Sequence, residues 1–313
     1  PTGDVVFKDG ATVLGTVALA SGTASHTTTA LATGDHTIVA AYQGSGDFET
    51  SNSSGTTVSV DPRVGPEFRV NTVTAGAQRY PALASLKAGG FVTVWTGQDG
   101  SGSGIVGQRY LSNGTKSGGE FRVNATTTDT QAFPTIVGTV DGGFATAWVS
   151  TAGTGKSNGL WGRRWSAAGT GVGGELRLDT TAGLEQSPPS LAARPAGGYV
   201  ATWISNRPNG GTYDVFARVV DGGGRVLGGE IDVATTAMAS LVSPPAIASL
   251  SGGGWIVVWA SSATAAAKPV IKGQRLTAAG AKAGGEFAVT GASFIQGEPV
   301  VAGTTDGGFV VAW

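Results

Sequence analysis

The 313-residue sequence has no cysteine, few charged residues and only two histidines. Without cysteine it can form no disulfide and offers no thiolate as a nucleophile or zinc ligand. Lys plus Arg number 20 and Asp plus Glu 21, which leaves no basic surplus for nucleic-acid binding and no polyanionic tail. Charged residues make up 13% of the chain, about half the ~25% that is usual in soluble domains. His26 and His36 offer little for a histidine metal site or a catalytic triad.

Long apolar runs are also missing. The longest, from Trp255 to Ala260, has six residues, whereas a membrane-spanning helix needs about 20, so we expect no membrane span. The first residues contain no basic region followed by an apolar one, so no signal peptide is expected. The chain is rich instead in glycine, with 53 residues, and it has eight tryptophans. This composition predicts many short strands joined by tight turns.

An internal repeat with a period of 53 to 56 residues organises positions 65–313. Four landmarks recur in the order Glu, Pro, Trp, Arg. The Glu is found at Glu67, Glu120, Glu175, Glu230 and Glu286, the Pro at Pro81, Pro134, Pro189, Pro245 and Pro299, the Trp at Trp95, Trp148, Trp203, Trp259 and Trp313, and the Arg at Arg109, Arg164, Arg218 and Arg275. The repeats begin near residues 65, 118, 173, 228 and 284, and the fifth is incomplete.

Each repeat predicts four antiparallel strands. In the first copy these are Ala82 to Leu86, Phe91 to Trp95, Ile105 to Leu111 and Glu120 to Asn124, with Gly-Gly and Asn-Gly turns between them. No repeat has an apolar pattern with a helical period. Four-stranded units of about 55 residues are typical of β-propeller blades. We therefore expect an all-β chain with a β-propeller over residues 63–313.

Several sequence segments of the repeat resemble those of a known protein family. The segments GGEFRVN at 118–124, DGGFATAW at 141–148 and GQRY at 107–110 resemble the degenerate repeats of giant RTX-like bacterial surface and adhesin proteins. The resemblance covers roughly residues 65–313. It implies a secreted protein at the bacterial cell surface. The calcium-binding nonapeptide of that family is absent from this sequence.

Residues 1–62 differ from the repeats, because they are rich in Thr, Ser and Ala and contain no Trp. The runs PTGDVVFKDG at 1–10 and GDHTIVAAY at 34–42 resemble a bacterial Ig-like domain of the group 3 type. The resemblance implies a β-sandwich, but the first two strands of that family would precede residue 1. We therefore expect a partial Ig-like sandwich, a short linker at 61–64, and a chain that is a piece of a longer protein.

Catalytic motifs are not evident. The Arg and Glu of each copy lie 11 or 12 residues apart and recur in every copy, so a structural pair or a loop anchor is favoured over catalysis. Trp161, Trp165 and Trp255 lie outside the repeating Trp position, which makes them candidates for ligand contact. Asp99, in a Gly/Ser-rich turn, is a weak candidate for calcium. No other cofactor or metal is expected.

Loop lengths locate the expected binding surface. The first hairpin keeps one length in all copies, whereas the loops between second and third strands vary in length and sequence. Those loops share one rim with the crossings between blades. This variable rim comprises loops 96–104, 149–159, 204–214 and 260–269 with crossings 72–80, 125–133, 180–188, 234–244 and 290–298. The preferred contact residues on it are Trp161, Tyr213 and Arg207.

The leading interpretation is a non-enzymatic extracellular adhesion module of a large secreted repeat protein, without hydrolase activity. Its partners would be other copies, other cell-surface proteins or surface glycans. One alternative is a carbohydrate-binding or carbohydrate-active β-propeller, which converging carboxylates at the axis would favour. Another is a structural subunit of an extracellular filament or surface assembly.

Overall fold

A computed structural model describes residues 2–46, 48–60, 67–151, 159–180, 186–206, 212–234, 238–239, 243–264, 267–291 and 297–313. The chain divides into two compact units, Pro1–Phe68 and Arg69–Trp313. The expected linker at 61–64 lies outside the described residues.

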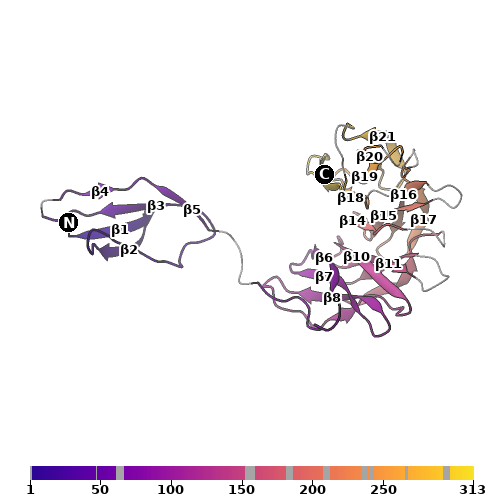
Figure 1. Ribbon diagram of the computed structural model, residues 1–313, viewed down its shortest axis with the longest axis horizontal. Helices are drawn as coiled ribbons and strands as arrows, with labels where there is room; N and C mark the ends of the chain where they lie inside the picture. The colour runs from indigo at the N-terminus through magenta and orange to yellow at the C-terminus, as the bar shows by residue number, and fades with distance from the viewer. Residues whose placement is uncertain are drawn as a thin grey trace. The chain divides into compact units, whose positions relative to one another are not determined.

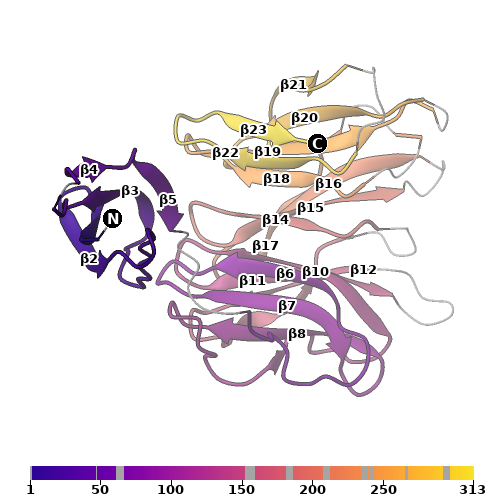
Figure 2. The same ribbon diagram turned by 60° about the vertical axis from the view of Figure 1, so that its left-hand side comes forward.

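The first unit is one antiparallel sheet of five strands. They are β1 (Asp4–Asp9), β2 (Thr12–Ala18), β3 (Gly34–Tyr42), β4 (Ser51–Asn52) and β5 (Thr56–Val60). The order is β2-β1-β3-β4, and β5 also pairs with β3. Val5 and Ala41 are its buried apolar residues. The five strands of the described part of this unit therefore belong to one sheet, which Figure 2 shows to be strongly curved. The sequence predicts part of a two-layer sandwich here.

The second unit contains four sheets of four antiparallel strands and one of two strands. Blade one comprises β6 (Arg79–Ser85), β7 (Phe91–Gln98), β8 (Ser103–Tyr110) and β9 (Phe121–Arg122). Blade two comprises β10 (Thr130–Gly138), β11 (Phe144–Thr151), β12 (Gly159–Trp165) and β13 (Gly171–Arg177). Blade three comprises β14 (Ser190–Ala193), β15 (Tyr199–Asn206), β16 (Tyr213–Val220) and β17 (Val226–Asp232). Blade four comprises β18 (Ala246–Ser249), β19 (Trp255–Ser261), β20 (Val270–Leu276) and β21 (Lys282–Ala288), and blade five comprises β22 (Val300–Gly303) and β23 (Phe309–Ala312).

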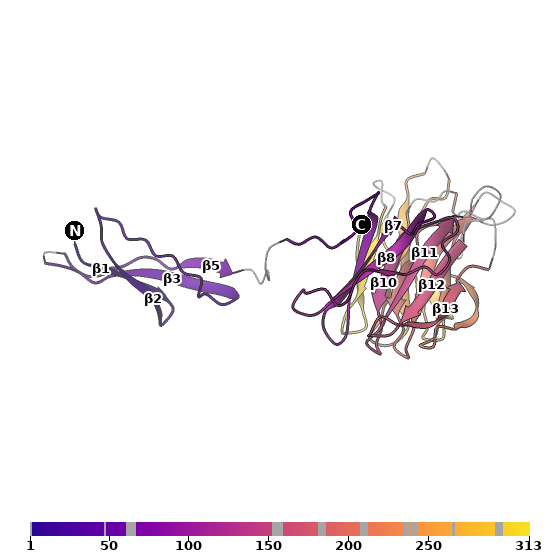
Figure 3. The same cartoon turned by 90° about the horizontal axis from the view of Figure 1, so that it is seen from below.

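The blades follow one another around a common centre (Figure 1), in a β-propeller-like arrangement. Contacts between blades join β6 to β10, β10 to β14, β14 to β18 and β18 to β22, so the first strand of each blade is the innermost. Figure 3 shows the strands of blades one and two next to each other. The all-β prediction and the four-strand repeat are confirmed.

The core lies between the blades. Trp148, Trp203 and Trp259 are at most 1% exposed, which confirms packing as the role of the repeating Trp. Trp165 and Trp255 are also buried, at 4% and 0% exposure, so their selection as ligand contacts is wrong. Second strands are apolar on both faces because a blade packs against each face.

The recurring Glu anchors the crossing of the preceding blade. Glu120 accepts hydrogen bonds from the backbone N–H groups of Thr72 and Val73, as Glu175 does from those of Ala125 and Thr126 and Glu230 from that of Thr180. Arg109 donates instead to the carbonyl oxygens of Ala167 and Ala168 in blade two, both at 2.6 Å. The loop-anchor interpretation is therefore correct for Glu120, Glu175 and Glu230, whereas Glu286 accepts from the Lys272 ammonium group at 2.6 Å. The partners of Glu120 and Arg109 lie in different segments.

Candidate functional site

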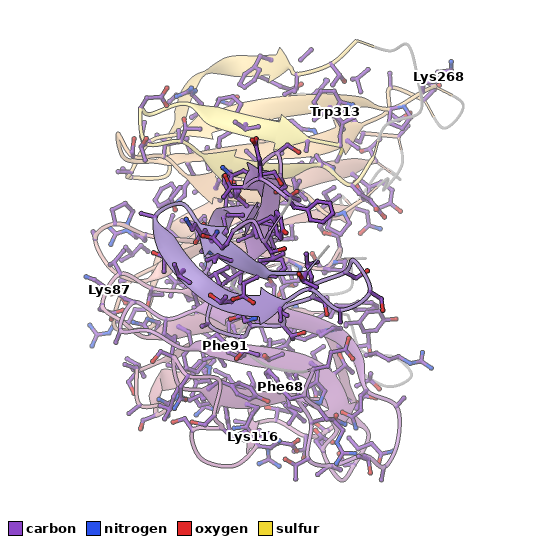
Figure 4. The ribbon with its side chains drawn as sticks, turned by 90° about the vertical axis from the view of Figure 1, so that its left-hand side faces the viewer. Phe68, Lys87, Phe91, Lys116, Lys268 and Trp313 are labelled. Atoms are coloured by element: carbon purple, nitrogen blue, oxygen red, sulfur yellow. The ribbon has the colours of Figure 1, made fainter. Side chains whose placement is uncertain are left out.

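The blades have two rims with different properties. Figure 4 shows Lys87, in a first hairpin, and Lys268, in a loop between second and third strands, at opposite ends of the strands. The first hairpins carry Gly-Gly pairs with positive φ, such as Gly89 and Gly90 at 90° and 78°. The topology thus separates a rim of fixed turns from the variable rim, as the loop lengths predict.

One position of the repeat stands where the innermost strands begin, on the variable rim. It is the residue directly before the recurring Pro, and it is aromatic in two copies, proline in two and glutamate in one. We call these the mouth residues: Tyr80, Phe133, Pro188, Pro244 and Glu298. Because the first strands of successive blades are neighbours, this position recurs at the same end of each innermost strand.

Three mouth residues have an unusual backbone. Tyr80, Phe133 and Glu298 have φ values of 55°, 55° and 51°, in the left-handed region that side chains disfavour. Holding a non-glycine residue there costs about 1–3 kcal/mol. A β-bulge accompanies this conformation in β6, between Arg79 and Ala82, and in β10, between Ala132 and Thr135. Strained residues of this kind are concentrated at functional sites.

The strained position brings two aromatic rings together. The ring centroids of Tyr80 and Phe133 are 4.2 Å apart with an interplanar angle of 40°, although the residues belong to different blades. Tyr80 is 45% exposed. At the other end of the series, Glu298 is exposed, and its backbone N–H donates to the Ser243 Oγ at 3.1 Å. The mouth thus offers an accessible aromatic surface and a carboxylate.

A cavity of about 190 Å³ adjoins Tyr80 on blade one. Its lining combines the aromatic Trp95 with the polar Asn71, Gln78 and Arg79, and Val70, Pro81 and Thr93 complete it. The indole N–H of Trp95 donates to the Gln78 Oε1 at 2.6 Å, which fixes both side chains. The cavity is smaller than the ~300–1,000 Å³ typical of drug-sized ligands, so it suits a small ring that packs against the indole of Trp95.

Buried amides hold the loops behind the mouth. The side chain of Asn124 donates to the Gln131 Oε1 at 3.0 Å and to the Asp99 Oδ2 at 3.1 Å. Gln131 donates in turn to the Thr128 carbonyl at 2.7 Å. Asp99 also accepts from the Ser101 N–H at 3.2 Å. Within the described ranges no three acidic or histidine residues form a metal-binding group, and the calcium candidate Asp99 serves here as a hydrogen-bond acceptor.

Two of the three residues selected from the sequence can be placed in the structure. Trp161, in β12, is partly buried and packs against the core between blades one and two. Tyr213, in β16, packs against the core of blades three and four, and its N–H donates to the Met238 carbonyl at 2.8 Å. Arg207 lies outside the described residues. A pattern of recurring residues does not single out the mouth residues, because the residue type at this position is not the same in all copies.

Comparisons with known proteins give a family match for the first unit and structural likenesses for the second. Residues 1–61 match the bacterial Ig-like domain (group 3) family. No curated protein matches the sequence. An α-L-arabinanase of Penicillium chrysogenum, solved with arabinobiose, is similar in structure, with a TM-score of 0.52 and 16% identity over 75% of this chain and 74% of that one. The α-L-arabinofuranosidase of Fusarium graminearum, also solved with arabinobiose, has a TM-score of 0.55 and 12% identity over the same shares.

A protein of unknown function from Dyadobacter fermentans has a TM-score of 0.51 and 12% identity, over 86% of this chain and 84% of that one. At these identities the likeness shows a common fold. It also overturns the leading interpretation from the sequence, a non-enzymatic adhesion module without hydrolase activity, because the similar folds of known activity are glycan-cleaving enzymes. The carbohydrate-related alternative agrees better with these neighbours. No helix in the described part of the chain could span a membrane.

Proposed function

We propose that the repeat domain is a carbohydrate-active β-propeller that binds a glycan at the mouth residues. The observation that carries the proposal is the pairing of Tyr80 and Phe133 across two blades, beside a small cavity lined by Trp95, Gln78 and Arg79. Aromatic faces contact the C–H groups of a sugar ring, and amide, guanidinium and carboxylate groups bind its hydroxyls. Strained backbone at Tyr80 and Phe133 supports a role beyond packing.

Cleavage of a glycosidic bond would need two carboxyl groups, one to protonate the leaving oxygen and one to act as a base or nucleophile. We assign Glu298, at the mouth, as one of them. The position of the arabinose-acting enzymes among the similar structures makes arabinose-containing oligosaccharides the first substrates to test.

The test measures binding and cleavage separately in the full chain. Titration calorimetry with arabino-oligosaccharides should give a signal that Tyr80→Ala and Phe133→Ala each weaken by about tenfold or more, a ~1.4 kcal/mol effect of the size expected for a lost aromatic contact. Leu83→Ala is the matched control, since Leu83 is an exposed side chain of the same strand β6. Release of reducing sugar should be abolished by Glu298→Gln while binding persists.

Equal binding by the wild-type, Tyr80→Ala and Phe133→Ala proteins would refute the site. Binding without release of sugar in the wild-type protein would restrict the function to glycan recognition.

We further propose an extracellular location at the bacterial surface, where such glycans are found. A calcium ion at Asp99 stays a prediction, which a comparison of glycan binding with calcium and with chelator tests.

A further inference from the structure

The turn between the third and fourth strands of blade one contains an asparagine followed by a glycine, Asn113-Gly114. The backbone N–H of Gly114 donates to the Leu111 carbonyl, and the N–H of Leu111 donates to the Thr115 carbonyl, both at 2.9 Å. Gly114 has a φ of 80°, a backbone conformation that glycine adopts without steric cost. Asn113 therefore stands at the tip of a tight turn and is exposed.

Blades two, three and four have the same turn between their third and fourth strands, closed by the same two backbone hydrogen bonds. Where blade one has Asn113, these blades have Ala168, Gly223 and Ala279. All three residues are exposed, although each belongs to a blade that follows another blade in the chain. The exposure of Asn113 is therefore a property of the turn, and the asparagine distinguishes blade one from the other three.

The side-chain amide of Asn113 is held by Thr115. Its Oδ1 accepts a hydrogen bond from the Thr115 N–H at 3.0 Å and a second one from the Thr115 hydroxyl at 2.8 Å. This oxygen becomes negatively charged when a nucleophile adds to the Asn113 Cγ. Hydrogen-bond donors that are already in place at such an oxygen stabilise the tetrahedral intermediate. Thr115 thus prepares the amide carbon for attack.

We propose that Asn113 is a modification site, at which the backbone nitrogen of Gly114 attacks the Asn113 Cγ and releases ammonia. The Gly114 nitrogen gives its proton to hydroxide and forms a bond to Cγ. The Cγ–Nδ2 bond then breaks, Nδ2 takes a proton from water and leaves as ammonia, and a succinimide ring remains. Water opens this ring at Cγ to give aspartate, or at the main-chain carbonyl carbon to give isoaspartate. One water is consumed and one ammonia is released, without oxidation or reduction.

The hydrogen bond from Gly114 to Leu111 has to open before this attack, and exposed turns open locally at a low free-energy cost. Both products place a carboxylate where the side chain was neutral, and isoaspartate also adds one carbon to the main chain between Leu111 and Thr115. Because this turn joins β8 to the two-residue strand β9, isoaspartate loosens the outer strand of blade one.

The turn lies beside the first hairpin of blade one, where a Cβ at Gly89 would be 3.3 Å from the Ser112 Cβ. It is therefore on the rim of fixed turns, at the opposite end of the strands from the mouth residues. The modification does not depend on the proposed function.

The test incubates the folded full chain at neutral pH in water enriched in heavy oxygen and follows each asparagine by peptide mapping and mass spectrometry. The peptide that contains Asn113 should gain one heavy oxygen, in two forms that fragmentation identifies as aspartate and isoaspartate. Thr115→Val removes the hydroxyl donor and keeps the backbone donor. It should slow the reaction at Asn113 about fivefold, the effect of losing one neutral hydrogen bond.

Thr170→Val is the matched control, since Thr170 has the place of Thr115 in the turn of blade two, and it should leave the rate at Asn113 unchanged. Asn158 and Asn209 are also followed by glycine, and their rates in the same sample should not respond to Thr115→Val. The proposal is overturned if Asn113 gains no heavy oxygen, or if it yields aspartate without isoaspartate, because the ring is then not formed. An equal rate in the wild-type and Thr115→Val chains overturns the role of Thr115.

Discussion

The imidazole Nδ1 of His36 lies 2.6 Å from the Oδ2 of Asp9, and its Nε2 lies 2.8 Å from the carbonyl oxygen of Ala32. Both ring nitrogens thus face acceptors, which only the protonated imidazolium can satisfy as a donor on each side. The hydrogen bond to Asp9, then that to Ala32, raises the pKa of His36 above 6.5. This contact joins strands β1 and β3 of the Ig-like unit.

The first prediction is therefore a pH dependence of that unit. A pKa that is higher in the folded than in the unfolded chain adds stability that is complete below pH ~6.5 and is lost as the pH rises through the folded value. Amide exchange of β1 and β3 in the full chain, corrected for the intrinsic rate, should be slower at pH 6 than at pH 8. Asp9→Asn should remove most of this difference. A profile that is unchanged in Asp9→Asn would contradict the assignment.

The second prediction compares two hairpins that share the sequence Thr-x-Asp-Gly-Gly, at 139–143 and at 304–308. Asp141→Asn leaves the buried Arg164 without its carboxylate and should lower the free energy of unfolding of the repeat domain by about 1–2 kcal/mol. Asp306→Asn should change it by less than about 0.5 kcal/mol, because no buried cation depends on Asp306 in the described structure. Urea titrations followed by tryptophan fluorescence measure this domain alone, since all eight Trp lie in it. Equal losses in both variants would show that Arg164 does not need its partner.

The third prediction compares the loss of stability when either of two adjacent glycines in the first hairpin of blade four is replaced by alanine. Gly253 and Gly254 have φ values of 89° and 81°. A Cβ at Gly253 meets nothing within 4 Å, whereas one at Gly254 would lie 2.2 Å from the Leu276 carbonyl oxygen. Gly253→Ala should cost about 1 kcal/mol for the left-handed backbone alone, and Gly254→Ala about 3 kcal/mol or more. The same urea titration checks this order, and similar losses would contradict it.

The fourth prediction concerns strain at the mouth. Glu298→Gly removes a side chain from a φ of 51° and should raise the stability of the repeat domain by about 1 kcal/mol. The same change should abolish sugar release, because the proposed carboxylate is gone. Glu298→Gln is the control that loses the charge but keeps the strain, so its stability should match the wild type. A Gly variant that is no more stable than the Gln variant would argue against stored strain.

Much of this architecture can be read from the sequence, because the repeat supplies five nearly independent observations of each strand. The Trp and Pro positions and the Gly-Gly turns are specified by packing and by backbone geometry that every copy shares. The mouth could not be found in this way. Its residues differ between Tyr80, Phe133 and Glu298 because each blade supplies a different chemistry to one place, and a search for recurring residues discards such positions.

A signal for the mouth was nevertheless present. Copies three and four have Pro188 and Pro244 at the position where the other copies have Tyr80, Phe133 and Glu298. Proline cannot adopt a positive φ. The same position is therefore proline in two copies and has a positive φ in the other three. The backbone has two different conformations at this place in the repeat.

The contact by which Glu120, Glu175 and Glu230 each hold the crossing of the preceding blade has a genetic consequence. In these three copies the same side chain binds backbone N–H groups at the start of the crossing, whereas Glu286 pairs with Lys272. One repeat of DNA therefore encodes a blade together with a means of attachment. Unequal recombination between repeats can then add or remove a blade without requiring a new interface. Lineages that differ by such events would keep identical seams and acquire different sets of rim loops.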